Sequence, residues 1–540
     1  MVACPRCWGR AFRVWRLAFG ARCSETSEEC QSWVSAWVRD ENMFRPGIAG
    51  EGEWKGLSIP IPVVRRRTPN AERRTPNAKR QTPNAHRLLE VVLLDEFMSQ
   101  LDDLIEFLRF PSVSADGQFK PQVEACADWL MGRLQKIGLQ VQKFPTAGHP
   151  IVVARNEHKA GRKTVLIYGH YDVQPPDPLE LWDSPPFEPV IRGDKIFARG
   201  STDNKGQILA HILGVEGALK EKGDLPVNLI LLVEGEEEVG SANLEGFLKE
   251  HRSSLQTDVI AISDTGMVAP GIPTFSYCLR GILCLEVRLR GPSADLHSGI
   301  FGGSVTNPAT VLSRLISKLH DEKGHIAVPG FYDRVAPLED WERELWTKLP
   351  YTEDGWRATT GTTKLGGEEG YTFLERVWAR PTAEVNGFAS GYRGEGPKTI
   401  IPSRAMAKLS FRLVPNQDPA ELKTVITNFL KTECPDTVEM EIIDQQSGRP
   451  YIVKPDSVFG KAAQRALATT FDKPVAFIRE GGSIPITQAF KEVLGVDTLL
   501  LGLALPDCKA HSPNENFAID NFYAGIRLNR NLLEEIARAA

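Results

Sequence analysis

Apolar residues from residue 101 onward recur at spacings that predict alternating helices and strands. A helical period runs through Leu101, Leu104, Ile105, Phe107 and Leu108. The segments that follow are helix Val123–Ile137, strand Val141–Phe144, strand Val165–Tyr168, helix Gln207–Lys220, strand Val227–Glu234, helix Leu244–His251 and strand Asp258–Ser263. Strands separated by helices predict an α/β fold with a mostly parallel sheet.

The pattern changes near Tyr277 and changes back near Tyr451. Between them lie strand Leu283–Arg290, helix Pro308–Leu319, a polar Trp-rich stretch over Asp321–Arg380, strand Ala405–Leu413, helix Asp418–Leu430 and strand Val438–Ile443. Helices at Ser457–Ala468 and Phe522–Ala537 then restore the α/β character. We therefore predict a catalytic domain over 93–276 and 451–540, interrupted by an inserted α+β lid or dimerisation domain over 277–450.

Residues 1–92 differ from the rest and are predicted to be a low-complexity, disordered extension. The Thr-Pro-Asn-Ala unit recurs with a period of seven at Thr68–Ala71, Thr75–Ala78 and Thr82–Ala85, and the prolines rule out a coiled coil. Cys4-x-x-Cys7 lacks a second pair at zinc-knuckle spacing, and the arginine-rich start leaves a transit peptide as an alternative. We hypothesise that this extension is dispensable; if it is not translated, the native chain starts near Val91 to Met98.

Composition narrows the class of protein. A net charge of -5 in 540 residues argues against a nucleic-acid binder. No apolar run approaches the ~18 residues of a transmembrane helix, so we expect no membrane partner. The five cysteines after residue 100 are scattered without a pattern, which is typical of free thiols in a reducing compartment. We therefore expect a cytoplasmic protein.

Histidine and carboxylate side chains end or follow several predicted strands. His170 and Asp172 follow the apolar run Val165–Tyr168, and Asp203 follows a Gly-flanked turn. Further candidates are Glu237 and Glu238 after strand Val227–Glu234, Asp264 after strand Asp258–Ser263, and His511 after the apolar run Leu499–Leu505. A lone member of this set would be structural, and the acidic triplet at Glu236 by itself fits a solvated loop equally well. Because parallel strands end at one edge of a sheet, we expect these side chains to converge.

Such a set of ligands predicts two divalent ions, with Zn²⁺ favoured and Mn²⁺ as the alternative. Imidazole and carboxylate groups without Cys suit both metals. Two neighbouring ions need a bridging carboxylate, and Asp203 is the natural bridge. Asp172 is placed to accept the second imidazole N–H of His170 and to hold its tautomer.

Four ordered motifs resemble the co-catalytic zinc exopeptidase family. They are Gly169-His170-Tyr171-Asp172-Val173-Gln174-Pro175, Arg199-Gly200-Ser201-Thr202-Asp203-Asn204-Lys205-Gly206, Glu234-Gly235-Glu236-Glu237-Glu238-Val239-Gly240-Ser241 and Ala510-His511-Ser512-Pro513. This family includes carnosinase-like dipeptidases, glutamate carboxypeptidase, aminoacylase, and the acetylornithine and succinyl-diaminopimelate deacylases. The resemblance covers roughly residues 98–540.

The resemblance implies roles for the candidates. His170, Asp203 and Asp264 would ligate one ion, and Asp203, Glu238 and His511 the other. Glu237 would be the general base that takes a proton from a metal-bridging water. Glu236 departs from the apolar residue usual in the family. The Asp203–Asn204 peptide bond is expected to be cis.

Further roles fall in the inserted domain and beyond it. By resemblance, His297 in Asp295-Leu296-His297-Ser298-Gly299 would reach the partner subunit's site and polarise the scissile carbonyl, which implies a homodimer through the inserted domain. Arg412 would clamp the terminal carboxylate of a peptide substrate. Thr399 and Ser483 are additional substrate-contact candidates. From the residues alone, His297 reads as a surface residue and Arg412 as an exposed strand arginine.

Tyr171, Gln174 and the long Trp-rich insertion resemble the dipeptidase branch. We therefore expect metal-dependent hydrolysis of an amide bond in dipeptides or short peptides. One alternative is an N-acyl amino-acid deacylase of the same family. An alternative from another class is a dimeric metal- or peptide-binding protein that has lost the chemistry.

Overall fold

The computed structural model describes residues 98–482, 484 and 486–539. The chain divides into two units, Met1–Leu101 and Asp102–Ala540, and the fold below is that of the second unit. The predicted extension over residues 1–92 lies outside the described residues, as does the candidate Ser483.

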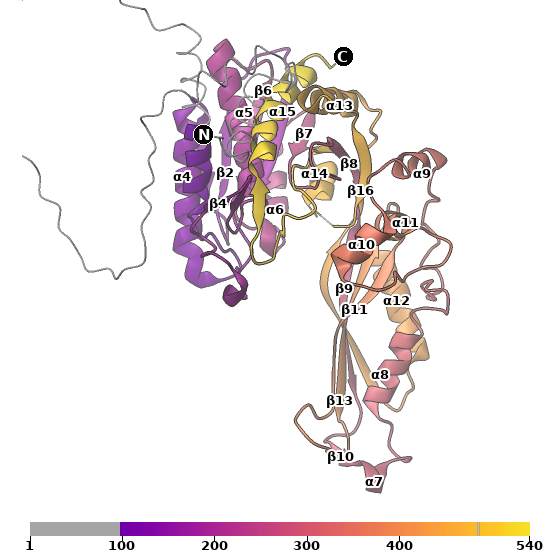
Figure 1. Cartoon of the computed structure of the whole chain (residues 1–540). Helices are drawn as coiled ribbons and strands as arrows, with labels where there is room; N and C mark the ends of the chain where they lie inside the picture. Colours follow the sequence, from indigo (N-terminus) through magenta and orange to yellow (C-terminus); the bar gives the residue numbers. More distant parts are fainter. Residues whose placement is uncertain (1–97, 483, 485, 540) are drawn as a thin grey trace, which may run out of the picture. The chain divides into compact units, whose positions relative to one another are not determined.

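A nine-stranded sheet forms the centre of this unit (Figure 1). Its strand order is β1 (Gln140–Phe144), β2 (Ile151–Arg155), β6 (Asn228–Glu234), β3 (Thr164–His170), β7 (Val259–Ile262), β17 (Thr498–Leu500), β8 (Thr274–Leu279) and β15 (Tyr451–Ile452), with β16 (Ala476–Glu480) pairing on β8. The central strands β6, β3, β7 and β17 are parallel to one another. The predicted mostly parallel sheet is confirmed, and antiparallel pairs flank it at β1·β2 and β2·β6.

Helices cover the central strands and explain their apolar sequences. These helices are α4 (Lys120–Lys136), α5 (Lys205–Lys222), α6 (Leu244–Glu250), α13 (Val458–Phe471), α14 (Ile486–Leu494) and α15 (Ile519–Ala537). Helix α15 packs against α5 and α13, α14 packs against α6, and α4 packs against β1 and β2. Every residue of β6 is buried, and so is every residue of β3 after Thr164. Burial on both faces is why these strands read as continuous apolar runs.

A second sheet has its own hydrophobic core. Its antiparallel order is β11 (Thr382–Ser390), β13 (Arg404–Leu413), β9 (Gly281–Arg290) and β14 (Glu439–Gly448). Alternate residues of β9 are buried under α8 (Pro308–Ser317) and α12 (Pro419–Glu433): Leu283, Leu285, Val287 and Leu289. One buried face and one polar face produce the period of two that predicted this strand.

The chain crosses between the two sheets at two short connections. Arg280 alone separates β8 from β9, and Arg449 with Pro450 separates β14 from β15. The two connections lie close together, since a Cβ on Gly281 would meet the Gly448 carbonyl oxygen and the Pro450 nitrogen at 2.7 Å each. The predicted boundaries after 276 and 450 fall within a few residues of these crossings, and the division into domains stays a prediction.

The Trp-rich stretch is partly helical, which the sequence pattern did not indicate. It contains α9 (Asp340–Trp346), α10 (Glu353–Thr360) and α11 (Phe373–Trp378). Trp346 and Trp378 are buried and meet edge to face, with ring centroids 5.1 Å apart. Helices of six to eight residues are too short for periodicity to detect. Among the described helices, none combines the length and apolar character of a membrane span.

Short elements complete the described part of the chain. A three-stranded sheet has the order β18 (Asn516–Ala518), β5 (Lys195–Phe197) and β4 (Val190–Arg192), and β10 (Leu296–His297) pairs with β12 (Ile400–Ile401) ahead of α7 (Ser298–Phe301). The 3₁₀ turns are η1 (Gly117–Phe119), η2 (Leu179–Leu181) and η3 (Glu237–Val239).

Candidate metal centre

The five predicted metal ligands come from five separate segments. His170 is the last residue of β3, Asp264 follows β7, and Glu238 lies in the η3 turn that follows β6. Asp203 precedes the first turn of α5, and His511 lies in the loop before β18. The strands β6, β3 and β7 are parallel neighbours, so their carboxyl ends share one edge of the sheet.

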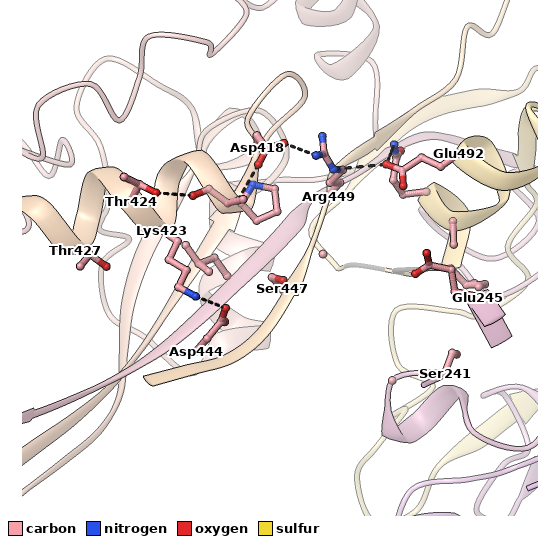
Figure 2. A pocket seen from close by; sticks show the side chains of 18 of the residues that line it. Ser241, Glu245, Asp418, Lys423, Thr424, Thr427, Asp444, Ser447, Arg449 and Glu492 are labelled. Carbon is pink, nitrogen blue, oxygen red and sulfur yellow. Dashed lines mark hydrogen bonds and ion pairs between the residues drawn. The ribbon is translucent and has the colours of Figure 1, made fainter. Parts of the chain in front are cut away.

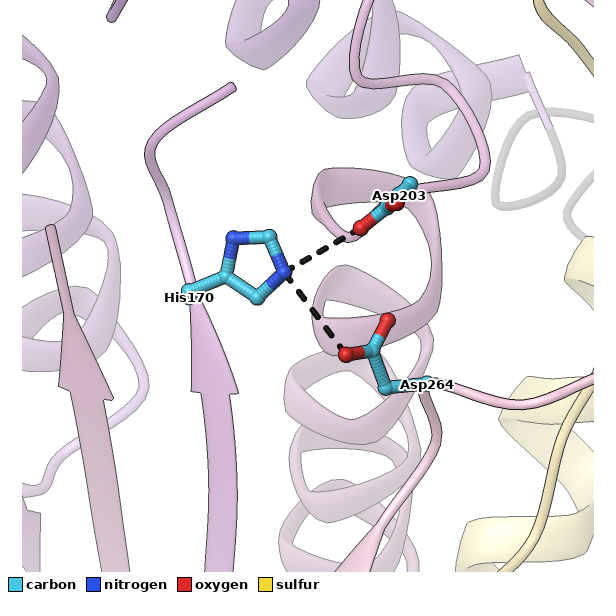
Figure 3. A group of neighbouring side chains, drawn as sticks. All are labelled: His170, Asp203 and Asp264. Carbon is cyan, nitrogen blue, oxygen red and sulfur yellow. Dashed lines mark ion pairs between the residues drawn. The ribbon is translucent and has the colours of Figure 1, made fainter. Parts of the chain in front are cut away.

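The first group consists of His170, Asp203 and Asp264 (Figure 3). The Nε2 atom of His170 lies 3.2 Å from Oδ1 of Asp203 and 3.8 Å from Oδ2 of Asp264. The two carboxylates therefore face the same imidazole nitrogen, as ligands of a shared cation would.

The second group consists of Asp203, Glu238 and His511. The Nε2 atom of His511 lies 2.8 Å from Oδ2 of Asp203 and 3.2 Å from Oε2 of Glu238. Asp203 thus belongs to both groups, with Oδ1 facing His170 and Oδ2 facing His511. A carboxylate that presents one oxygen to each group has the geometry of a bridge between two cations.

The protonation of His170 leaves one ring nitrogen available to a cation. Its Nδ1 lies 3.1 Å from the carbonyl oxygen of Asp172 and 3.3 Å from Oδ1 of the same residue, which places the proton on Nδ1. Its Nε2 is buried and has no hydrogen-bond partner among the residues that the structure describes. An orphaned buried nitrogen facing two carboxylates fits a metal ligand.

The charge of the cluster also fits divalent cations. Burial, followed by the charge of Asp203, raises the pKa of Asp264 well above its usual range. Burial raises the pKa of Glu237 in the same way, and the nearby Asp264 and Glu238 carboxylates add to the shift. Carboxylates that disfavour one another's charge are stabilised by cations placed among them. Two imidazoles and three carboxylates without a thiolate suit Zn²⁺ or Mn²⁺.

The structure separates the three consecutive glutamates. Glu238 reaches the second group and also accepts a hydrogen bond from Nε2 of Gln174 at 2.9 Å. Glu236 points elsewhere and accepts a hydrogen bond from Nδ2 of Asn243 at 2.7 Å. The Asp172 carboxylate accepts the backbone N–H groups of Glu237 and Glu238, at 3.3 and 3.1 Å. Asp172 therefore ties the end of β3 to the turn that carries both glutamates.

Two residues that the sequence analysis missed hold the groups in place. Asn204 donates through Nδ2 to the Ser263 carbonyl oxygen at 2.7 Å and to Oδ1 of Asp264 at 2.9 Å. The peptide bond between Asp203 and Asn204 is cis, as expected. Glu515 is fully buried and accepts hydrogen bonds from the loop that carries Asp203. The available signals were the position of Asn204 directly after the bridge and a lone acid directly before the Asn516–Ala518 strand.

The remaining predicted residues lie outside these two groups. His297 lies on β10 opposite Ile400 of β12, and the adjacent Ser298 N–H donates to the Thr399 carbonyl oxygen at 3.0 Å. His297 and Thr399 are therefore neighbours. Arg412 lies near the end of β13, opposite Ile282 of β9 and close to the crossing into the nine-stranded sheet.

A polar pocket of about 760 Å³ lies beside the crossing at Arg449 (Figure 2). None of the five predicted metal ligands is among its lining residues. Its cations are already paired: Lys423 lies 2.7 Å from Asp444, and Arg449 contacts both Asp418 and Glu492. The pocket thus offers no unpaired cation among its lining residues to a substrate carboxylate.

A parallel sheet with imidazole and carboxylate ligands gathered at its strand ends is typical of metal-dependent hydrolases. Comparison with known proteins defines the class: Peptidase family M20/M25/M40 matches residues 166–535, and the chain belongs to this family. The predicted family resemblance and the prediction of a peptidase are thereby confirmed.

Individual relatives narrow the class further. The chain is 34% identical over 468 residues to the Cys-Gly metallodipeptidase dug1 of Schizosaccharomyces pombe, covering 82% of this chain and 96% of the relative. It is 30% identical over 450 residues to the Beta-Ala-His dipeptidase of Homo sapiens, covering 80% and 89%. A solved M20 family metallo-carboxypeptidase, Sso-CP2 of Sulfolobus solfataricus, superposes with a TM-score of 0.74 at 34% identity, covering 81% and 99%. The predicted dipeptidase branch is supported by the first two relatives.

Proposed function

We propose that the chain hydrolyses dipeptides or short peptides at a centre of two divalent ions, with Zn²⁺ as the expected metal. The observation that carries this proposal is the position of Asp203, whose two oxygens face two separate ligand groups. His170, Asp203 and Asp264 would hold one ion, and Asp203, Glu238 and His511 the other. When bound, the two ions supply Lewis acidity that lowers the pKa of a water molecule and polarises a carbonyl.

Glu237 is the proposed general base. Its backbone N–H donates to Asp172, and its half-buried side chain places the carboxylate among the charges of His170, Asp264 and Glu238. It accepts a proton from the attacking water, whose oxygen bonds to the scissile carbonyl carbon. The carbon–nitrogen bond then breaks, and Glu237 returns the proton to the leaving amine.

The position of His297 favours a homodimer. Strand β9 runs from the crossing at Arg280 to Arg290, and β10 and β12 lie beyond that far end. The ten residues of β9 span about 30 Å at about 3.3 Å each, so His297 lies far from the crossing at Arg280 within its own chain. His297 would therefore act in the partner subunit's site, and the neighbouring Thr399 would lie in that same site. Arg412, at the near end of the same sheet, would bind the substrate's terminal carboxylate.

A cytoplasmic location is part of this proposal. The cysteines that the structure describes, Cys126, Cys278, Cys284, Cys434 and Cys508, are all free thiols. Free thiols are usual in a reducing compartment.

The test is release of free amino acids from a dipeptide panel that includes Cys-Gly and β-Ala-His. Metal-stripped protein reloaded with Zn²⁺ or Mn²⁺ is compared with Glu237→Gln and with the exposed control Glu344→Gln. We expect Glu237→Gln to lower kcat by about 10²- to 10⁴-fold at unchanged metal content. The control should match wild type.

Two other outcomes would replace the proposal. Faster turnover of N-acetyl or N-succinyl amino acids than of any dipeptide would identify a deacylase. Equal inactivity of wild type and Glu237→Gln with metal bound would identify a binding protein. Longer peptides cleaved from the carboxyl end would extend the activity toward that of the Sulfolobus relative.

A further inference from the structure

Glu515 lies at the centre of a buried hydrogen-bond network around the loop that carries Asp203. Its Oε2 accepts hydrogen bonds from Nη1 of Arg199 at 2.8 Å and from the backbone N–H of Gly200 at 2.9 Å. Its Oε1 accepts the backbone N–H groups of Thr202 at 2.9 Å and of Asp203 at 3.1 Å. One carboxylate thus satisfies four donors within five consecutive residues.

The network is closed to water. Glu515 is 0% exposed and Arg199 is 1% exposed. A second nitrogen of Arg199, Nη2, donates to the Pro175 carbonyl oxygen at 3.2 Å, in the segment that follows Asp172. A buried ion pair is weak evidence for stability because desolvation offsets its attraction, but a carboxylate whose two oxygens both accept hydrogen bonds can favour one arrangement of the backbone.

Other contacts bind the same loop to the strand that begins after Glu515. Oγ1 of Thr202 donates to the Asn516 carbonyl oxygen at 2.8 Å. Gly206 packs so closely that a Cβ would lie 2.1 Å from the Ser201 carbonyl oxygen and 2.7 Å from the Phe517 ring. The loop therefore has little freedom to shift relative to β18.

Glu515 also follows His511 closely in the sequence, at the end of the same short loop. The loop between them includes two residues with positive φ, His511 at 59° and Asn514 at 64°, and it leads directly into β18. Glu515 consequently joins two segments that are distant in sequence, one carrying Asp203 and the other carrying His511. Those two residues are members of the second ligand group.

We propose that Glu515 is a positioning residue that sets the placement of Asp203 relative to His511. It acts through the Arg199–Asp203 backbone and has no contact with substrate. The inference rests on the proposed two-ion function and identifies which residue outside the ligand set determines the geometry of the second group.

The experiment measures metal binding directly on the full-length chain. Metal-stripped wild type, Glu515→Gln, Glu515→Asp and Glu342→Gln are titrated with Zn²⁺ by calorimetry, and their Co²⁺ forms are compared by visible absorption. Glu342→Gln is the matched control, because Glu342 is also buried and accepts hydrogen bonds from an arginine and a tyrosine, Arg479 and Tyr277. It makes none of its described hydrogen bonds to the five candidate ligands.

Glu515→Gln places an amide donor against backbone N–H groups and removes the charge that pairs with Arg199. We expect the second Zn²⁺ to bind about 10- to 100-fold more weakly, with a changed Co²⁺ spectrum. At saturating Zn²⁺, kcat should fall while KM stays within about twofold of wild type. Glu515→Asp keeps the charge but shortens the side chain, so it should weaken binding of the second Zn²⁺ less than Glu515→Gln does. Glu515→Asp carries the test if Glu515→Gln does not fold. Glu342→Gln should lose thermal stability and bind both ions as wild type does.

The proposal is overturned if the folded Glu515 variants bind both ions with wild-type affinity and spectrum. It is also overturned if Glu342→Gln weakens binding of the second Zn²⁺ to the same extent, since the effect would then be general destabilisation. Failure of the proposed two-ion function would give a different result, because wild type itself would then bind no second ion. The proposed role of Glu515 would be rejected together with that function.

Discussion

Oδ2 of Asp203 lies 2.8 Å from Nε2 of His511, which joins the start of α5 to a loop near the end of the chain. The other oxygen of Asp203 faces His170 at 3.2 Å. The same side chain therefore serves two ligand groups, and its loss should affect both.

We predict that Asp203→Asn reduces the bound Zn²⁺ from two ions per chain to one or fewer. The amide keeps the shape of the carboxylate but can present only one uncharged oxygen acceptor, so it cannot bridge two cations. Because each ion contributes several kcal/mol of charge stabilisation, kcat should fall by at least about 10²-fold. Metal content after gel filtration and dipeptide turnover measure the two effects. The exposed variant Asp354→Asn should retain both ions, and an Asp203→Asn protein with two ions would contradict the bridge.

We predict that Asp172→Asn weakens metal binding without unfolding the protein. The Asp172 carboxylate accepts the Glu237 and Glu238 backbone N–H groups and lies 3.3 Å from Nδ1 of His170. An amide would turn a donor toward one of these groups and would hold the imidazole tautomer less well. Zn²⁺ affinity should fall by about 10- to 100-fold. Calorimetric titration measures the loss, and an unchanged affinity with lowered Tm would indicate a purely structural role.

We predict that two inactive variants restore activity when they share a dimer. His297→Ala removes the residue proposed to act in the partner's site, and Glu237→Gln removes the base of the chain's own site. In a mixed dimer, one of the two sites has both residues intact. Random mixing of the two chains should therefore recover about a quarter of wild-type activity. Co-expression with two affinity tags provides the mixed dimer, and no recovery in that dimer would place His297 in the site of its own chain.

We predict that His211 makes the folded protein less stable, relative to the unfolded chain, as the pH falls. It is buried in α5, its Nε2 lies 2.9 Å from Oγ of Ser263, and burial lowers its pKa to about 3. The unfolded chain binds this proton with a pKa of about 6.5. The stability that neutral His211 contributes is therefore present above about pH 6.5 and declines toward pH 3, by up to about 1.4 kcal/mol per pH unit.

Urea unfolding of metal-stripped protein between pH 7 and pH 4 measures this slope. His211→Gln should flatten it relative to wild type. The exposed control His158→Gln should leave it unchanged. Equal slopes in wild type and His211→Gln would show that other groups govern the loss of stability in acid.

The sequence by itself determined the central strands and the chemical identity of the candidate ligands. Strands such as β3 and β6 are buried on both faces, so their apolar runs are visible without a structure, and the polar residue that ends each run marks the ligand edge. Alternation in β9 likewise revealed the second sheet, because one of its faces packs on the core. Local pattern is sufficient wherever burial follows a regular period.

Only the tertiary structure decided which groups meet. The three consecutive glutamates are equivalent in sequence, but the η3 turn directs Glu238 to His511 and leaves Glu236 with Asn243. The short helix α9 is held by buried contacts such as the hydrogen bond from Arg479 to Glu342, which no local period records. The hydrogen bonds of Glu515 join it to Thr202 and Asp203, which lie 313 and 312 residues earlier in the chain, and hydrogen bonds between distant parts of a chain have no signature in either part alone.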